Sequence, residues 1–60
     1  MVGSFENKDK CIAELKNQCF IFYTAIAGIT YYYSKSKQEI AEINIYKDGS
    51  ASALIGKYKI

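Results

Sequence analysis

Apolar residues near the N-terminus recur every three or four positions along the chain. The positions that follow this spacing are Ile12, Leu15, Cys19, Phe22 and Ile26. Such spacing places side chains on one face of an α-helix. Ser4 or Asn7 can cap the start of this helix, and Gly28 is suited to its end. The pattern therefore predicts an amphipathic helix over about residues 7–27.

A shorter helix is the alternative. Residues 20–24 are phenylalanine, isoleucine, tyrosine and threonine, which favour β-strands. If the helix ended at Gln18, this segment would form a strand, and Ala27 and Gly28 would form a hairpin turn. We favour the long helix because the helical spacing keeps its phase as far as Ile26, and propensity is the weaker signal.

The rest of the chain has the composition of β-strands. Residues 29–33, 38–47 and 50–60 are the expected strands, and Asp48 with Gly49 forms a typical hairpin turn. We therefore expect one α+β domain over residues 1–60, with two layers. Its helix, about residues 7–27, packs on a three-stranded antiparallel β-meander (αβββ). The alternative is αββββ with a shorter helix.

The hairpin turn also predicts how the last two strands pair. If its loop has only two residues, Ile45 lies opposite Ser52 and Ile43 lies opposite Leu54. A bulge after Gly49 would instead shift the last strand by one residue and exchange its two faces. The sequence leaves both registers open.

The composition excludes several kinds of chemistry. The chain has no histidine, so histidine metal ligands, histidine bases and the Ser-His-Asp mechanism are absent. Cys11 and Cys19 would lie about 12 Å apart on one helix, too far for a disulfide. Glu39 and Glu42 would point to opposite faces of a strand. We therefore expect no catalytic residue, no metal site, no cofactor and no enzymatic activity.

The cysteines and the N-terminal segment indicate the cellular compartment in which we expect the protein. Two unpaired, buried thiols are typical of a reducing compartment. The chain shows no basic segment followed by an apolar run and a small-residue cleavage site, which a secretory signal requires. Residues 19–33 are uncharged, but they are too short and too rich in tyrosine for a membrane-spanning helix. We expect a cytoplasmic protein with no membrane partner.

Tyrosine is the unusual feature of the composition. Six of the 60 residues are tyrosine, and three of these, residues 31–33, are consecutive. Neighbouring strand residues point to opposite faces, so at least one ring lies outside the core. Tyrosine rings suit protein interfaces, although they also pack on lysine side chains and simply cover a sheet. The candidate interface residues are Phe20, Ile21, Tyr31, Tyr32, Tyr33 and Tyr46.

These features predict a small binding or regulatory protein, such as an inhibitor or adaptor. It would act through a protein–protein interface, with a second copy as a homodimer or with another protein. The alternative is a weak module for single-stranded nucleic acid that uses tyrosine and lysine on the open sheet face. The net charge of only +2 and the absence of arginine count against it. Its candidate contacts are Lys35, Lys37, Lys47 and Lys57.

Overall fold

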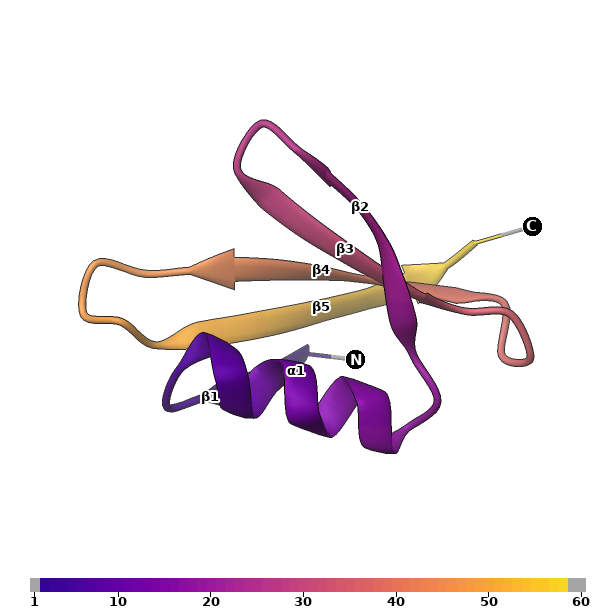
Figure 1. The fold of residues 1–60 in the computed structure, drawn as a ribbon, viewed down its shortest axis with the longest axis horizontal. Helices are drawn as coiled ribbons and strands as arrows, with labels where there is room; N and C mark the ends of the chain where they lie inside the picture. The colour runs from indigo at the N-terminus through magenta and orange to yellow at the C-terminus, as the bar shows by residue number, and fades with distance from the viewer. Residues whose placement is uncertain (1, 59–60) are drawn as a thin grey trace.

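The computed structural model describes residues 2–58 and shows one helix packed on a five-stranded antiparallel sheet (Figure 1). The elements are β1 (Val2–Phe5), α1 (Lys8–Asn17), β2 (Ile21–Ile26), β3 (Ile29–Ser34), β4 (Glu39–Ile45) and β5 (Ala51–Lys57). The expected α+β class and its two layers are confirmed. Within residues 2–58, no helix has the length and apolar character needed to cross a membrane.

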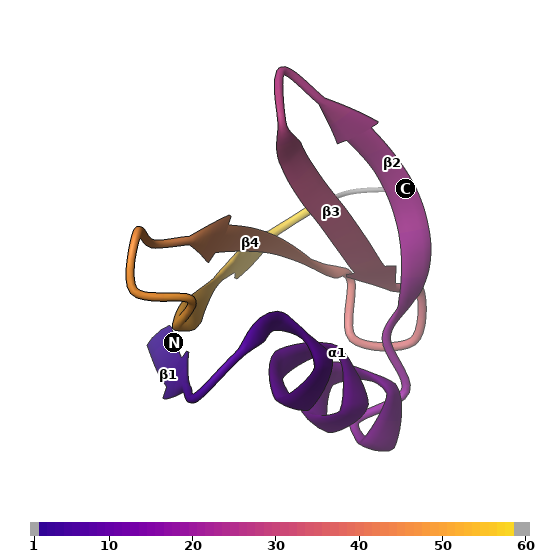
Figure 2. The same cartoon turned by 60° about the vertical axis from the view of Figure 1, so that its left-hand side comes forward.

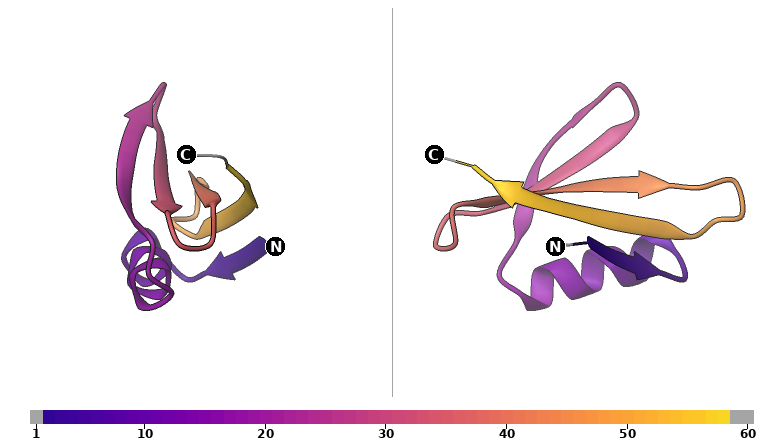
Figure 3. Two further views of the ribbon diagram at one scale, coloured as in Figure 1. Left: turned by 90° about the vertical axis from the view of Figure 1, so that its right-hand side faces the viewer. Right: turned by 180° about the vertical axis from the view of Figure 1, so that it is seen from behind.

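The sheet places the first strand beside the last. Its strand order is β1-β5-β4-β3-β2, so β1 and β2 form the two edges. The helix contacts β1, β5 and β4. The β2–β3 hairpin rises away from α1 (Figures 1 and 2). The sheet is strongly twisted when seen along its length (Figure 3). α1 therefore covers one side of the sheet mainly over β1, β5 and β4.

The helix is shorter than the favoured prediction, and the alternative with a shorter helix is the one that the structure has. Asn7 is the N-cap, and its side chain accepts a hydrogen bond from the Lys10 amide at 2.9 Å. At the other end, the Phe20 amide donates to the Leu15 carbonyl at 2.9 Å, and the Cys19 amide donates to Lys16. These two bonds form a Schellman motif, which ends the helix before residue 20.

The residue that ends the helix is therefore Cys19, and not Gly28. Cys19 has a φ of +70°, in the left-handed region that such a C-terminal motif requires. Glycine usually occupies this position, and a cysteine gives no such signal in the sequence. Gly28 instead lies with Ala27 in the turn between β2 and β3, where both have positive φ. The described residues thus form five strands, two more than the predicted three-stranded meander.

One of the two additional strands is β2, which the alternative anticipated. The other is β1, which neither arrangement included. It pairs with β5 so that Gly3 lies opposite Ala53 and Phe5 lies opposite Ala51. A four-residue strand with a glycine and a serine has little strand propensity of its own. Its pairing with the far end of the chain is a tertiary contact, which local pattern does not reveal.

The register of β4 and β5 follows the bulged alternative. Ile43 lies opposite Ala53 and Ile45 lies opposite Ala51, one residue away from the register of a two-residue loop. The Tyr46 amide donates to the Ser50 carbonyl at 2.9 Å, and Gly49 adopts a φ of +91°. This is a three-residue loop with a glycine bulge. The shift turns the alanines of β5 toward the helix.

The core lies between α1 and the central strands. Leu15 and Cys11 of the helix pack against small side chains of the sheet. Phe20, which follows the helix, is 1% exposed and closes one end of this layer. Among residues 3–58, every buried polar side-chain atom has a hydrogen-bond partner. The buried core residues are Cys11, Leu15, Phe20, Tyr32, Ala41, Ile43, Ala51 and Ala53.

Replacing Cys19 with glycine should stabilise the protein. A left-handed conformation costs a non-glycine residue about 1–2 kcal/mol, and the greater freedom of glycine in the unfolded chain offsets part of that gain. The Cys19 side chain is exposed, so no packing is lost. We expect Cys19→Gly to raise the free energy of unfolding by about 0.5–1 kcal/mol in urea titrations.

The matched control introduces glycine within the helix. Ala13 is exposed in the middle of α1, where glycine lowers stability by about 1 kcal/mol. Opposite signs for Cys19→Gly and Ala13→Gly are the expected result. Equal destabilisation by both would show that residue 19 is not held in the left-handed region.

Candidate protein-interaction surface

The edge strand β2 exposes four large apolar side chains, which we call the edge-strand surface. The exposed fractions are 55% for Ile21, 57% for Phe22, 46% for Tyr23 and 61% for Ile26. Exposed side chains alternate with buried ones along a strand with one buried face, but all four of these are exposed. β2 is therefore a strand without a covered face.

The position of the hairpin explains this exposure. The chain leaves α1 at Cys19, buries Phe20 and then runs away from the helix as β2 (Figure 2). A β-bulge between Phe22 and Thr24 adds to the twist of the strand. Figure 3 shows that α1 lies below the start of β2 and does not extend along it. The residues of β2 that face the helix side consequently have no helix to pack on.

A second feature lies on the face of the sheet that points away from the helix. The Tyr23 ring lies 5.4 Å from the Tyr33 ring and 5.8 Å from the Tyr58 ring, between centroids. The hydroxyl oxygens of Tyr23 and Tyr58 are 3.0 Å apart and share a hydrogen bond. We call these three residues the tyrosine cluster. It connects the edge strand to the end of β5, since Tyr58 directly follows that strand.

Hydrogen bonding gives the cluster its electrostatic character. The hydrogen bond with the Tyr23 hydroxyl raises the pKa of Tyr58 above its ordinary value. Desolvation and the negative charges that Tyr23 and Tyr33 carry when ionised raise this pKa further. The raised pKa favours the neutral form of the Tyr58 hydroxyl, which can donate a hydrogen bond.

The structure divides the predicted interface residues into four groups. Phe20 and Tyr32 are 1% and 6% exposed, so they belong to the core and are not available at the surface. Ile21 is exposed in the edge-strand surface. Tyr31 and Tyr33 are half-buried on the face away from the helix. Tyr46 is exposed beyond the end of β4, where its hydroxyl bonds to Ser52 Oγ at 2.8 Å.

The lysines of the nucleic-acid alternative do not form one patch. Lys35 and Lys37 lie in the loop between β3 and β4, and Lys57 Nζ lies 3.8 Å from a Glu39 carboxylate oxygen. Lys47 lies in the loop between β4 and β5, at the opposite end of the sheet (Figure 1). The Lys37 ammonium group lies over the Phe20 ring at 5.4 Å from its centroid. Lys35, Lys37 and Lys57 thus lie near one end of the sheet, and Lys47 is separated from them.

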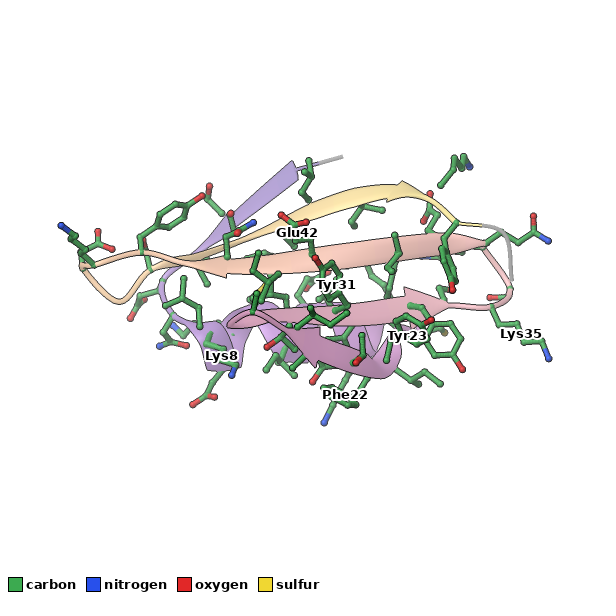
Figure 4. All side chains as sticks on the ribbon, turned by 90° about the horizontal axis from the view of Figure 1, so that it is seen from above. Lys8, Phe22, Tyr23, Tyr31, Lys35 and Glu42 are labelled. Atoms are coloured by element: carbon green, nitrogen blue, oxygen red, sulfur yellow. The ribbon has the colours of Figure 1, made fainter. Side chains whose placement is uncertain are left out.

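An acidic residue also occupies the centre of the open face. Glu42 lies directly opposite Tyr31 in the pairing of β3 with β4. Figure 4 shows the two side chains next to each other above the sheet, on the side away from the helix. A carboxylate beside the tyrosine repels phosphate groups. The open face therefore gives little support to the nucleic-acid alternative.

Several residues of these features were not among the predicted interface residues. Phe22 and Ile26 belong to the apolar spacing that predicts the long helix, and Tyr23 lies within the same segment. Their strand propensity was the signal that could have identified them. Tyr58 was not among them either, and its ring joins the tyrosine cluster.

Over residues 2–58, no group of three or more cysteine, aspartate or glutamate side chains is placed to hold a metal ion, and no pocket forms. Cys11 and Cys19 are both free. Burial raises the pKa of the Cys11 thiol, which keeps it in its unreactive neutral form.

The hydrogen bond in the tyrosine cluster predicts a pH effect. Because the folded-state pKa of Tyr58 is raised, its stabilising contribution is complete below the unfolded pKa, near 10, and is lost as the pH rises through the folded value. We expect Tyr23→Phe to lower the Tyr58 pKa in an NMR titration of ¹³Cζ-labelled tyrosine. Tyr31→Phe is the control, because Tyr31 is not part of the cluster, and an equal change in both variants would contradict the assignment.

Comparison with known proteins gives no relative from which a function could be transferred. No protein-family model, no curated protein and no solved structure matches this chain. Its function is therefore inferred from its own residues, of which the edge-strand surface and the tyrosine cluster are the most distinctive.

Proposed function

We propose that this protein is a non-enzymatic binding protein that recognises another polypeptide through the edge-strand surface. The observation that carries the proposal is the exposure of Ile21, Phe22, Tyr23 and Ile26 on one edge strand. An edge strand can add an extended polypeptide to its sheet. Main-chain hydrogen bonds then contribute affinity, and the alternate side chains contribute specificity.

The sequence of β2 supports this function because it lacks the usual protection of a free edge. Sheet edges in monomeric proteins commonly carry lysine, proline or inward-pointing charges that prevent pairing. The strand Ile21–Ile26 contains none of these, and no charged residue occurs between Lys16 and Lys35. The opposite edge, β1, has only four residues and lies against the helix. β2 is therefore the edge at which pairing is favoured.

The aromatic residues supply the second part of the proposed interface. Phe22 contacts Tyr32 edge-to-face, with ring centroids 5.8 Å apart, so its ring is partly ordered before any partner binds. Tyr23 is held in the same way by the tyrosine cluster. Pre-ordered aromatic side chains lose little entropy on binding and are frequent hot spots. We infer that these two rings anchor the partner.

A charge placed in β2 tests the proposal. Ile26→Lys adds a lysine at an exposed position of the edge, which disfavours strand addition while changing stability by no more than about 0.5 kcal/mol. As probe we would use a phage-displayed library of random peptides, selected on the immobilised protein. The expected result is enrichment of extended peptides rich in apolar residues, whose binding falls at least tenfold on Ile26→Lys.

The matched control is Leu54→Lys. Leu54 is 50% exposed on β5, two strands away from β3, and its neighbour Glu42 can pair with the new lysine. Peptide binding should survive this substitution. Peptides that bind wild type and Ile26→Lys equally would contradict the proposal. So would salt-sensitive binding of oligothymidine in place of peptides, because that is the behaviour of the nucleic-acid alternative.

A further inference from the structure

We propose that the edge-strand surface pairs with the same strand of a second copy. The two β2 strands would run antiparallel about a two-fold axis between Tyr23 and Thr24, and would join the two sheets into one. This inference rests on the proposed function and names the partner. The supporting observation is the sequence in which successive side chains of β2 point to one face of the sheet or to the other.

That order follows from the pairing of β2 with β3. Phe22 and Ala25 lie opposite Tyr32 and Thr30, which are on the helix side of the sheet. The other β2 residues lie on the open side: Ile21 opposite Tyr33, Tyr23 against the Tyr33 ring, Thr24 opposite Tyr31 and Ile26 opposite Ile29. From residue 21 to residue 26, the side chains therefore point to the open side, the helix side, the open side twice, the helix side and the open side.

This order is the same in both directions, which is what a two-fold pairing requires. Residues directly opposite each other in an antiparallel pair share a face. In the proposed register Ile21 meets Ile26 of the second copy, and Phe22 meets Ala25 of the second copy. Each of these contacts joins residues of one face. A shift by one residue in either direction would place Phe22 opposite a residue of the other face.

The β-bulge between Phe22 and Thr24 creates this symmetry. In a regular strand of six residues, the first and the last point to opposite faces. A two-fold pairing centred between the third and the fourth would then be impossible. The bulge places Tyr23 and Thr24 on the same face, so the two halves of the strand match. The irregularity thus has a consequence for assembly as well as for twist.

The main chain is also arranged for this register. Ala27 and Gly28 form a two-residue turn, so Ile26 and Ile29 are the hydrogen-bonded pair next to it. The N–H and C=O groups of Ala25 therefore point to the free edge. On the other side of the bulge, the same geometry directs those of Phe22 outward. Each Phe22–Ala25 pair of the dimer would exchange two main-chain hydrogen bonds.

The exposed area suits a dimer. The side chains of the edge-strand surface are about half exposed, which leaves roughly 100 Å² on each and about 400 Å² on each copy. Two copies thus offer at most about 800 Å² from these side chains, and pairing also covers the main-chain edge, which is comparable with the roughly 1,000 Å² of a biological interface. The surface carries no charge, so a second copy meets no repulsion there.

A cysteine pair tests the register. The variant is Ile21→Cys/Ile26→Cys, made in the Cys19→Gly background. The cysteine at position 21 then meets the cysteine at position 26 of the second copy, at a Cα separation of about 4.5 Å, which is within disulfide range. The same two residues lie about 16 Å apart along one strand, so they cannot pair within a chain. Cys11 is fully buried and stays in place.

The expected product under mild oxidation is a covalent dimer of twice 6.8 kDa. Each single variant, Ile21→Cys or Ile26→Cys, should remain largely uncoupled, because identical positions are far apart in this register. Light scattering of the wild-type chain in reductant should show a dimer that Ile26→Lys dissociates and Leu54→Lys retains. Circular dichroism identifies any variant that fails to fold. If the first cysteine pair fails to fold, Phe22→Cys/Ala25→Cys tests the same register.

Other outcomes would overturn this inference. A monomer at millimolar concentration would exclude the pairing, and peptide binding that still depended on Ile26 would then leave the proposed function standing. If the single and the double cysteine variants formed the disulfide-linked dimer equally well, the proposed register of the two β2 strands would be excluded. A monomer that also selects no peptides would refute both the pairing and the proposed function.

Discussion

The width of one helix determines how much of this sheet can be buried. A helix with its side chains is about 10–12 Å across, and neighbouring strands lie about 4.8 Å apart, so one helix covers about three strands. α1 covers β1, β5 and β4. The alanines of β4 and β5, which are Ala41, Ala51 and Ala53, allow it to lie close to them. With five strands and one helix, β2 is left without a layer, and β3, which buries Tyr32 and Ser34, is covered only in part.

The end of the helix decides which strands these are. The Schellman motif at Cys19 turns the chain while Phe20 is still in the core, and all later residues of β2 lie outside it. Packing within the chain covers only about half of each large apolar side chain of β2, so it explains only part of the apolar composition of this strand. The core is also small, and a single core of this size rarely contributes more than about 3–5 kcal/mol to the stability of the fold. Covering β2 in an assembly adds buried apolar area that the monomer lacks.

The sequence was sufficient for the features that depend on local pattern, and insufficient for those set by tertiary contacts. The α+β class, the Asn7 cap and the strands after residue 28 follow from periodicity and capping. The long helix was favoured because Phe22 and Ile26 happen to keep a helical phase with Leu15. The pairing of β1 with β5 depends on contacts distant in sequence, whereas the left-handed Cys19 and the bulge at Tyr23 arise from nearby contacts that no residue type in the sequence marks. Phe22, Tyr23 and Ile26 were missed because their strand propensity, which could have identified them, conflicts with the helical spacing of the apolar residues.

The bulge connects the tyrosine cluster to the proposed assembly. It turns Tyr23 to the open face, where its ring meets Tyr33 and its hydroxyl meets Tyr58. In the two-fold register Tyr23 also lies opposite Thr24 of the second copy, next to the axis. The two clusters would then approach each other across the joined sheets, on the face that no helix covers. A single irregular residue thereby relates three properties of the chain: the twist of the hairpin, the order of the aromatic rings and the match between two free edges.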